Sequence, residues 1–120
     1  MKLKIEYTED NKFLKVLEFM DHMFPFSELR RREIEVFALI LEYNYKYKDY
    51  PDKEKIMLLD SPEVRKEIAN RLGINIRILY TLTSSLKSKG FIGNYNMVNE
   101  TYKKTLIDAG DELIINFIKA

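Results

Sequence analysis

The stretch 61–92 constrains the fold of this chain more than any other part of the sequence. It reads as two short helices separated by Gly73, followed by an extended segment after Gly90. Ser61 is a favourable cap for the first helix, and Pro62 suits its first position. A glycine between two helices permits the left-handed turn that side chains with a Cβ resist. The pattern therefore predicts a helix-turn-helix unit.

The second helix of this unit is predicted over residues 75–89, and its residues divide into two faces. Leu79, Leu82 and Leu86 are three and four residues apart, so they form one apolar stripe that we expect to face inward. Asn75 is suited to cap the helix. The polar residues between the leucines are then left on the outward face.

Apolar, glycine and cap positions of this stretch form one continuous register: Leu72, Gly73, Ile74, Asn75, Leu79, Leu82, Leu86, Gly90, Phe91 and Ile92. This register resembles the recognition half of MarR-type winged helix-turn-helix proteins. The resemblance implies that the second helix is followed by a wing, which is a hairpin of two strands, expected here at 91–97 and 102–107. It also implies a short strand at 56–59 that pairs with the wing.

The rest of the chain adds elements to this core. Residues 2–7 alternate apolar and polar side chains, which predicts a half-buried strand, and a helix should follow to about Met23. Ser27 can cap a central helix over 28–43. Residues 112–119 favour a final strand, with a short helix as the alternative. The predicted fold is an α+β winged helix-turn-helix in one domain, with a strand and helix at 1–26, the core at 27–107 and a C-terminal strand at 108–120.

Charge is distributed unevenly along the chain. Residues 61–107 carry 8 Lys/Arg and 3 Asp/Glu, whereas residues 1–60 carry 11 Lys/Arg and 13 Asp/Glu. Phosphate contacts dominate the affinity of proteins for nucleic acids. If the protein binds a duplex, the basic segment that holds the helix-turn-helix is where we expect it to bind.

Composition argues against several other classes of function. The chain has no cysteine and one histidine, so it offers no thiolate metal site or thiol nucleophile. It lacks a phosphate-binding glycine loop and the spacing of metal ligands, so we predict no enzyme activity and no cofactor. No apolar run approaches the length of a membrane span, and the first residues lack the pattern of a signal peptide. We expect a cytoplasmic protein of a bacterial or phage-infected cell.

The first functional hypothesis is binding of double-stranded DNA by a small transcriptional regulator that inserts helix 75–89 into the major groove. Arg77 is the best candidate for guanine or phosphate, and Asn75 and Thr81 can add hydrogen bonds to base edges. Arg65 and Lys87 would position the phosphate backbone. The complete set of candidate nucleic-acid-binding residues is Arg65, Asn75, Arg77, Tyr80, Thr81, Ser84, Lys87, Lys103 and Lys104.

The second hypothesis is a protein-interaction or assembly module, such as one from a phage. Ile76, Ile78 and Tyr80 are apolar at positions where MarR-type readers usually have polar side chains, and exposed apolar residues suit a protein interface. The sequence leaves the oligomeric state open, because a monomer and a dimer through the terminal strands are equally consistent with it.

Two further basic stretches have a structural and a functional interpretation. Arg30, Arg31 and Arg32 are followed by Glu33 and Glu35, which favours a solvated helix start with counter-charges over phosphate contact. Residues 44–55 alternate tyrosine and lysine, a pattern that can stack on nucleic acid. We favour a surface loop there, with its tyrosines packed back on the domain.

Overall fold

The computed structural model describes residues 12–108, and over this range the fold is helical. The described residues contain no strand, and one isolated antiparallel bridge joins Ile92 and Val98. The predicted α+β winged-helix fold is therefore wrong. The elements are α1 (Lys12–Met20), η1 (Phe26–Glu28), α2 (Arg31–Lys46), α3 (Asp52–Leu59), α4 (Pro62–Leu72), α5 (Ile76–Ser88), η2 (Asn94–Asn96), α6 (Glu100–Tyr102) and the π-helical η3 (Lys103–Asp108).

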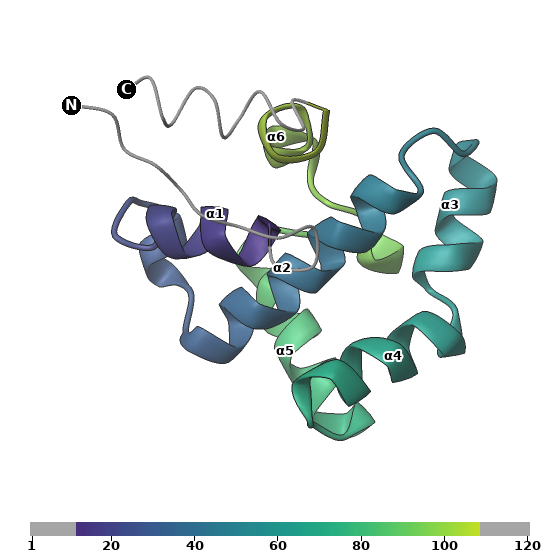
Figure 1. The fold of residues 1–120 in the computed structure, drawn as a ribbon, viewed down its shortest axis with the longest axis horizontal. Helices are drawn as coiled ribbons and strands as arrows, with labels where there is room; N and C mark the ends of the chain where they lie inside the picture. Colours follow the sequence, from purple (N-terminus) through teal and green to yellow (C-terminus); the bar gives the residue numbers. More distant parts are fainter. Residues whose placement is uncertain (1–11, 109–120) are drawn as a thin grey trace.

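Helix α2 lies at the centre of the described fold, as its nearly continuous apolar surface predicts. It packs against α1, α3, α4, α5 and η3 (Figure 1), and Val36, Phe37 and Leu41 are fully buried. Its bounds lie three residues later than predicted. The Arg30 amide donates to the Glu33 carboxylate over 2.8 Å, so Arg30 precedes the first turn, and the predicted cap residue Ser27 belongs to the 3₁₀ turn η1.

The predicted helix-turn-helix unit is present as α4 and α5. The Ser61 hydroxyl accepts from the Val64 amide at 3.2 Å, and Pro62 occupies the first turn of α4. Gly73 has φ 64°, which is the left-handed conformation expected after α4. The Asn75 side chain accepts from the Ile78 amide at 2.8 Å and caps α5. Local capping and turn signals therefore set the bounds of both helices.

The segment before α4 is a helix and not the predicted strand at 56–59. Residues 44–55 were expected to form a loop, but α2 continues to Lys46 and α3 begins at Asp52. Pro51 precedes α3, and Asp52 and Glu54 in its first turn suit the positive end of a helix. Leu59 is buried at the other end of α3. As part of a helix, Leu59 reaches the core without the neighbouring strand that a β-strand at 56–59 would need.

The predicted wing is reduced to a short turn. The Gly93 amide donates to the Met97 carbonyl at 2.8 Å and the Asn99 amide donates to the Phe91 carbonyl at 3.1 Å, which flank the single Ile92–Val98 bridge. The buried Asn44 side chain holds this turn, because its amide donates to the Asn96 carbonyl at 3.0 Å and its oxygen accepts from the Val98 amide at 3.1 Å.

Residues 102–107, predicted as the second strand of the wing, are helical, and this helix packs side chains from one of its faces on the core. Asn99 caps α6, its side chain accepting from the Thr101 amide at 3.0 Å. The Tyr102 ring stacks on Phe91 with 5.1 Å between ring centroids, and Leu106, four residues later, is buried. Spacing by four places both side chains on one helical face.

Helix α1 ends at Met20, three residues before the expected Met23. The predicted strands at 2–7 and 112–119 lie outside the described residues. None of the helices in the range 12–108 has the length and apolar character needed to cross a membrane.

Candidate nucleic-acid interface

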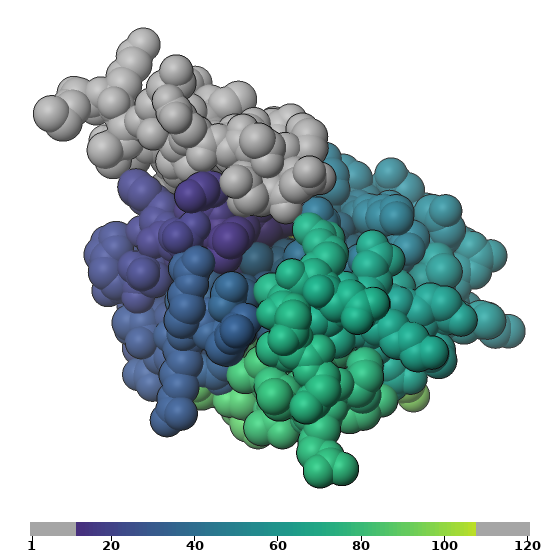
Figure 2. All heavy atoms as spheres, turned by 60° about the horizontal axis from the view of Figure 1, so that its bottom comes forward, coloured from purple at the N-terminus to yellow at the C-terminus, as the bar shows by residue number. Residues whose placement is uncertain are grey.

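Helix α5 is fixed to the fold by its inward face. Leu79 and Leu86 are buried, and Leu82 packs against the same core. In Figure 1, α5 lies along the side of α2 that faces away from α6. In Figure 2, the teal and green atoms of α4 and α5 stand forward. The outward face of α5 is therefore an open surface of the described structure.

An ion pair between Lys89 and the buried carboxylate of Glu33 joins the C-terminal end of α5 to α2. Lys89 Nζ lies 2.8 and 3.0 Å from the two carboxylate oxygens of Glu33, which also accept from the Ser85 hydroxyl and the Arg30 amide. Burial alone would raise the pKa of Glu33, but the hydrogen bonds from Lys89, Ser85 and Arg30 together lower it below its ordinary value. Glu33 is therefore an ionised anchor.

The outward face of α5 combines polar and apolar side chains, and it carries cations and no carboxylate of its own. Its exposed side chains include Arg77, Thr81, Ser84 and Lys87. Residues 68–99 contain no aspartate or glutamate, so the whole surface of α5 is free of negative side chains from its own segment. Arg77 forms no ion pair with any residue of the range 12–108. Its guanidinium is thus available for a ligand anion or a base edge.

Arg65 brings α4 into the same surface. Its guanidinium carbon lies 5.6 Å from the centroid of the Tyr80 ring, and its Nη1 atom lies 3.6 Å from an Asp60 carboxylate oxygen. The cation–π contact supports the Tyr80 ring, which is 47% exposed, at the outward face of α5. Arg65 is partly neutralised by Asp60, so it contributes less positive charge than Arg77.

The turn after α5 extends the surface beyond the residues predicted from the sequence. Lys87 Nζ donates to the Asn94 side chain at 2.6 Å, which links α5 to the turn. Tyr95 is 52% exposed and has φ 62°, a conformation that is uncommon for a residue with a Cβ. Thr83, Ser84, Lys87 and Tyr95 line a shallow hollow of about 120 Å³. Tyr95 was predicted to lie in a strand, although Gly93 and the two asparagines that flank Tyr95 are typical of a turn.

The structure does not bring Lys103 and Lys104 to this surface through a wing. Both lie on η3, which packs on α2 and α6, and Figure 1 shows α6 on the other side of α2 from α5. Lys103 Nζ lies 3.9 Å from the Glu100 carboxylate. Seven of the nine candidate residues therefore lie on α4, at the cap of α5 or on α5, and these two lysines lie apart.

Most charges of the other basic stretches contact other residues of the protein, although residues 44–46 and 52–55 are helical and do not form the expected loop. Arg31 pairs with Glu18 at 3.2 Å, and Arg32 lies 3.6 Å from the Glu35 carboxylate. Lys48 Nζ lies 4.4 Å from the centroid of the Tyr45 ring, and Tyr45 packs against the core. The charges and rings of both stretches are thus largely occupied by contacts within the protein.

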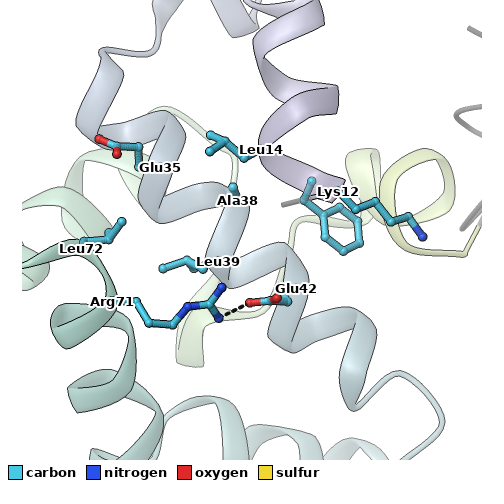
Figure 3. Close-up of a pocket in the computed structure, with 9 residues that line it drawn as sticks. Lys12, Leu14, Glu35, Ala38, Leu39, Glu42, Arg71 and Leu72 are labelled. Carbon is cyan, nitrogen blue, oxygen red and sulfur yellow. Dashed lines mark hydrogen bonds and ion pairs between the residues drawn. The ribbon is translucent and has the colours of Figure 1, made fainter. Parts of the chain in front are cut away.

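A pocket of about 150 Å³ between α1, α2 and α4 is the main alternative site (Figure 3). Phe13, Leu39 and Leu72 contribute apolar walls, and the Arg71 guanidinium donates to the Glu42 carboxylate within it. The described residues contain no cluster of acidic, histidine or cysteine side chains that could hold a metal ion. Since Arg71 and Glu42 are paired with each other, the pocket is less suited to an anionic ligand than the surface of α5.

Comparison with known proteins adds no assignment: no family model, curated protein or solved structure matches this chain. The functional argument therefore depends on the geometry and charge of the α5 surface.

Proposed function

We propose that this protein binds duplex DNA and that α5 enters the major groove. The observation that carries the proposal is an exposed, carboxylate-free face on the second helix of a helix-turn-helix unit. The major groove of DNA is wide enough to admit an α-helix, and residues in the first turns of such a helix reach base edges. The open face of α5 meets both requirements. Control of transcription is the role we propose for this binding.

The contacts divide between phosphate and base. Arg77 lies in the first turn of α5 and can donate two hydrogen bonds to one guanine. Lys87 in the last turn and Arg65 on α4 are placed for phosphates on either side of the groove. The Asn75 oxygen is used by the cap, so only its amide donors remain for DNA.

A protein-binding role is the second candidate, and two exposed side chains favour it. Ile78 is 45% exposed and lies two residues from the exposed Tyr80. Ile76, the third member of the predicted apolar face, packs instead against the core. Under this alternative, a stoichiometric partner co-purifies with the wild-type protein and is lost on Ile78→Asp.

The proposal is tested by titrating a labelled random-sequence duplex with the protein at several salt concentrations. We expect binding whose logarithm falls linearly with the logarithm of the salt concentration, with a slope of several units, because phosphate contacts release counterions. Arg77→Ala should weaken binding, and Lys104→Ala, which makes the same charge change on η3, should not. The absence of binding even at low salt would overturn the proposal.

A further inference from the structure

The N-terminal half of the outward face of α5 carries exposed methyl groups. Ile78 is 45% exposed although it belongs to a helix with a well-formed core face. Thr81 lies three residues later, so its side chain is a neighbour of Ile78 on the same side of the helix. Ile78 and Thr81 form a small apolar strip, and the cation Arg77 lies next to it.

The Thr81 side chain shows why this strip is apolar. Its Oγ1 atom donates to the Arg77 carbonyl of the preceding turn at 3.2 Å. This hydrogen bond within the helix occupies the donor of the hydroxyl. The hydroxyl then keeps only its acceptor lone pairs, and the Cγ2 methyl group of the exposed Thr81 is the apolar part of the side chain that can contact a ligand. Ile78 and Thr81 therefore present hydrocarbon to whatever covers α5.

One group in the major groove matches this chemistry. The C5-methyl of thymine is the apolar feature that distinguishes a thymine from the other bases there, and threonine methyl and aliphatic side chains contact it. Carboxylate and amide side chains are the usual partners of the cytosine and adenine amino groups, and neither lies between Arg77 and Thr81.

We propose that Ile78 and Thr81 select thymine-containing sites through the C5-methyl group. The inference rests on the proposed binding of duplex DNA by α5. It explains the exposure of Ile78 without a protein partner, and it assigns the specificity of the site to methyl contacts beside one cation, Arg77.

The test compares two duplexes that differ only in the methyl group. One is a duplex of alternating dA and dT, and the other has the same length with deoxyuridine in place of every thymidine. Burial of one methyl group favours binding about fourfold. We expect the wild-type protein to bind the thymine duplex about tenfold more tightly than the uracil duplex, because two side chains contribute.

Two conservative variants locate the effect. Thr81→Ser keeps the hydroxyl and removes its methyl, and Ile78→Ala removes most of the other apolar contact. Each should lower the thymine-to-uracil affinity ratio severalfold and leave the unfolding midpoint unchanged. Ser84→Ala, a change at an exposed α5 residue outside the strip, should leave the ratio unchanged.

The possible failures are distinguishable. Equal binding of the two duplexes by the wild-type protein would overturn the inference and leave the proposed function in place. A ratio that both variants preserve would also overturn it. Binding to neither duplex would overturn the proposed function, and the inference with it.

Discussion

The inward and outward faces of α5 differ in what holds their side chains. Inward, Leu79 and Leu86 are buried, and Ser85 joins the ion pair of Glu33 and Lys89. Outward, Arg77 and Ile78 are exposed. The inward face therefore sets the orientation of α5, and the outward face can change without loss of stability. Substitutions on the inward face should lower the free energy of unfolding, whereas substitutions on the outward face should weaken DNA binding.

The largest effect is expected on the inward face. Leu86→Ala should lower the free energy of unfolding by about 2–5 kcal/mol, because it removes a fully buried side chain and leaves a cavity. Ser84→Ala on the outward face is the control, with an expected change within about 0.5 kcal/mol. Urea unfolding followed by circular dichroism measures both. Equal destabilisation by the two substitutions would contradict the division into faces.

The second-largest effect on stability is expected at Glu33, which binds Lys89 and Ser85 at the C-terminal end of α5. Glu33→Gln removes the charge that accepts from Lys89, Ser85 and Arg30, and we expect a loss of about 2 kcal/mol at neutral pH. Glu35→Gln is the matched control, because its pair with Arg32 is partly exposed and should contribute less than about 0.5 kcal/mol.

The same variant tests the pH dependence of stability. The pKa of Glu33 is lowered by folding, so ionised Glu33 stabilises the fold above the unfolded-state pKa of about 4.3. That contribution is lost as the pH falls through the lower pKa of the folded state. Stability measured from pH 6 downward to about pH 3 should therefore fall less in Glu33→Gln than in the wild type. Parallel curves would show that Glu33 is not an ionised anchor.

The outward face should affect binding without affecting stability. Arg77→Ala should weaken duplex binding about tenfold and, if Arg77 contacts a phosphate, reduce the slope of the salt dependence by about one. Its free energy of unfolding should stay within about 0.5 kcal/mol of the wild type, because no ion pair within residues 12–108 is lost. Comparable losses of stability and binding would assign Arg77 to the fold.

The smallest loss of stability is expected at the N-terminal cap of α5, Asn75, where the two faces meet. Asn75→Ala should cost about 1 kcal/mol of stability, because the Ile78 amide loses its acceptor. Asn75→Ser keeps a capping oxygen and should recover most of the loss. If the serine variant is as unstable as the alanine variant, the cap contributes little to α5.

The sequence was most informative where the signals are local. Ser61, Gly73 and Asn75 each act within one turn of chain, and all three occupy the predicted positions. Residues 91–97 and 102–107 were predicted as two strands because these residues favour β structure. That preference depends on a pairing partner. The contact of Tyr102 with Phe91 and the burial of Leu106 favour a helix there instead.

In the candidate site too, the sequence predicted local features and missed features that depend on contacts between distant segments. Once Leu79 and Leu86 face inward, the outward positions of Arg77 and Thr81 follow from the helical period. The place of Lys104 depended on a wing that the described residues do not form. The exposure of Tyr95 depends on contacts of Asn44, about fifty residues earlier, with the 93–96 turn and the residues that follow it, and no sequence period reports such a contact.

If DNA covers the outward face of α5, it should protect a thiol on that face from alkylation. The sequence has no native cysteine, so a single introduced thiol can be followed directly. Ser84→Cys places one thiol on α5, and Thr105→Cys places one at an exposed position of η3. The rate of thiol alkylation is measured with and without a saturating duplex. We predict strong protection of the thiol in Ser84→Cys and none in Thr105→Cys. Unchanged alkylation in Ser84→Cys while the duplex is bound would contradict the account.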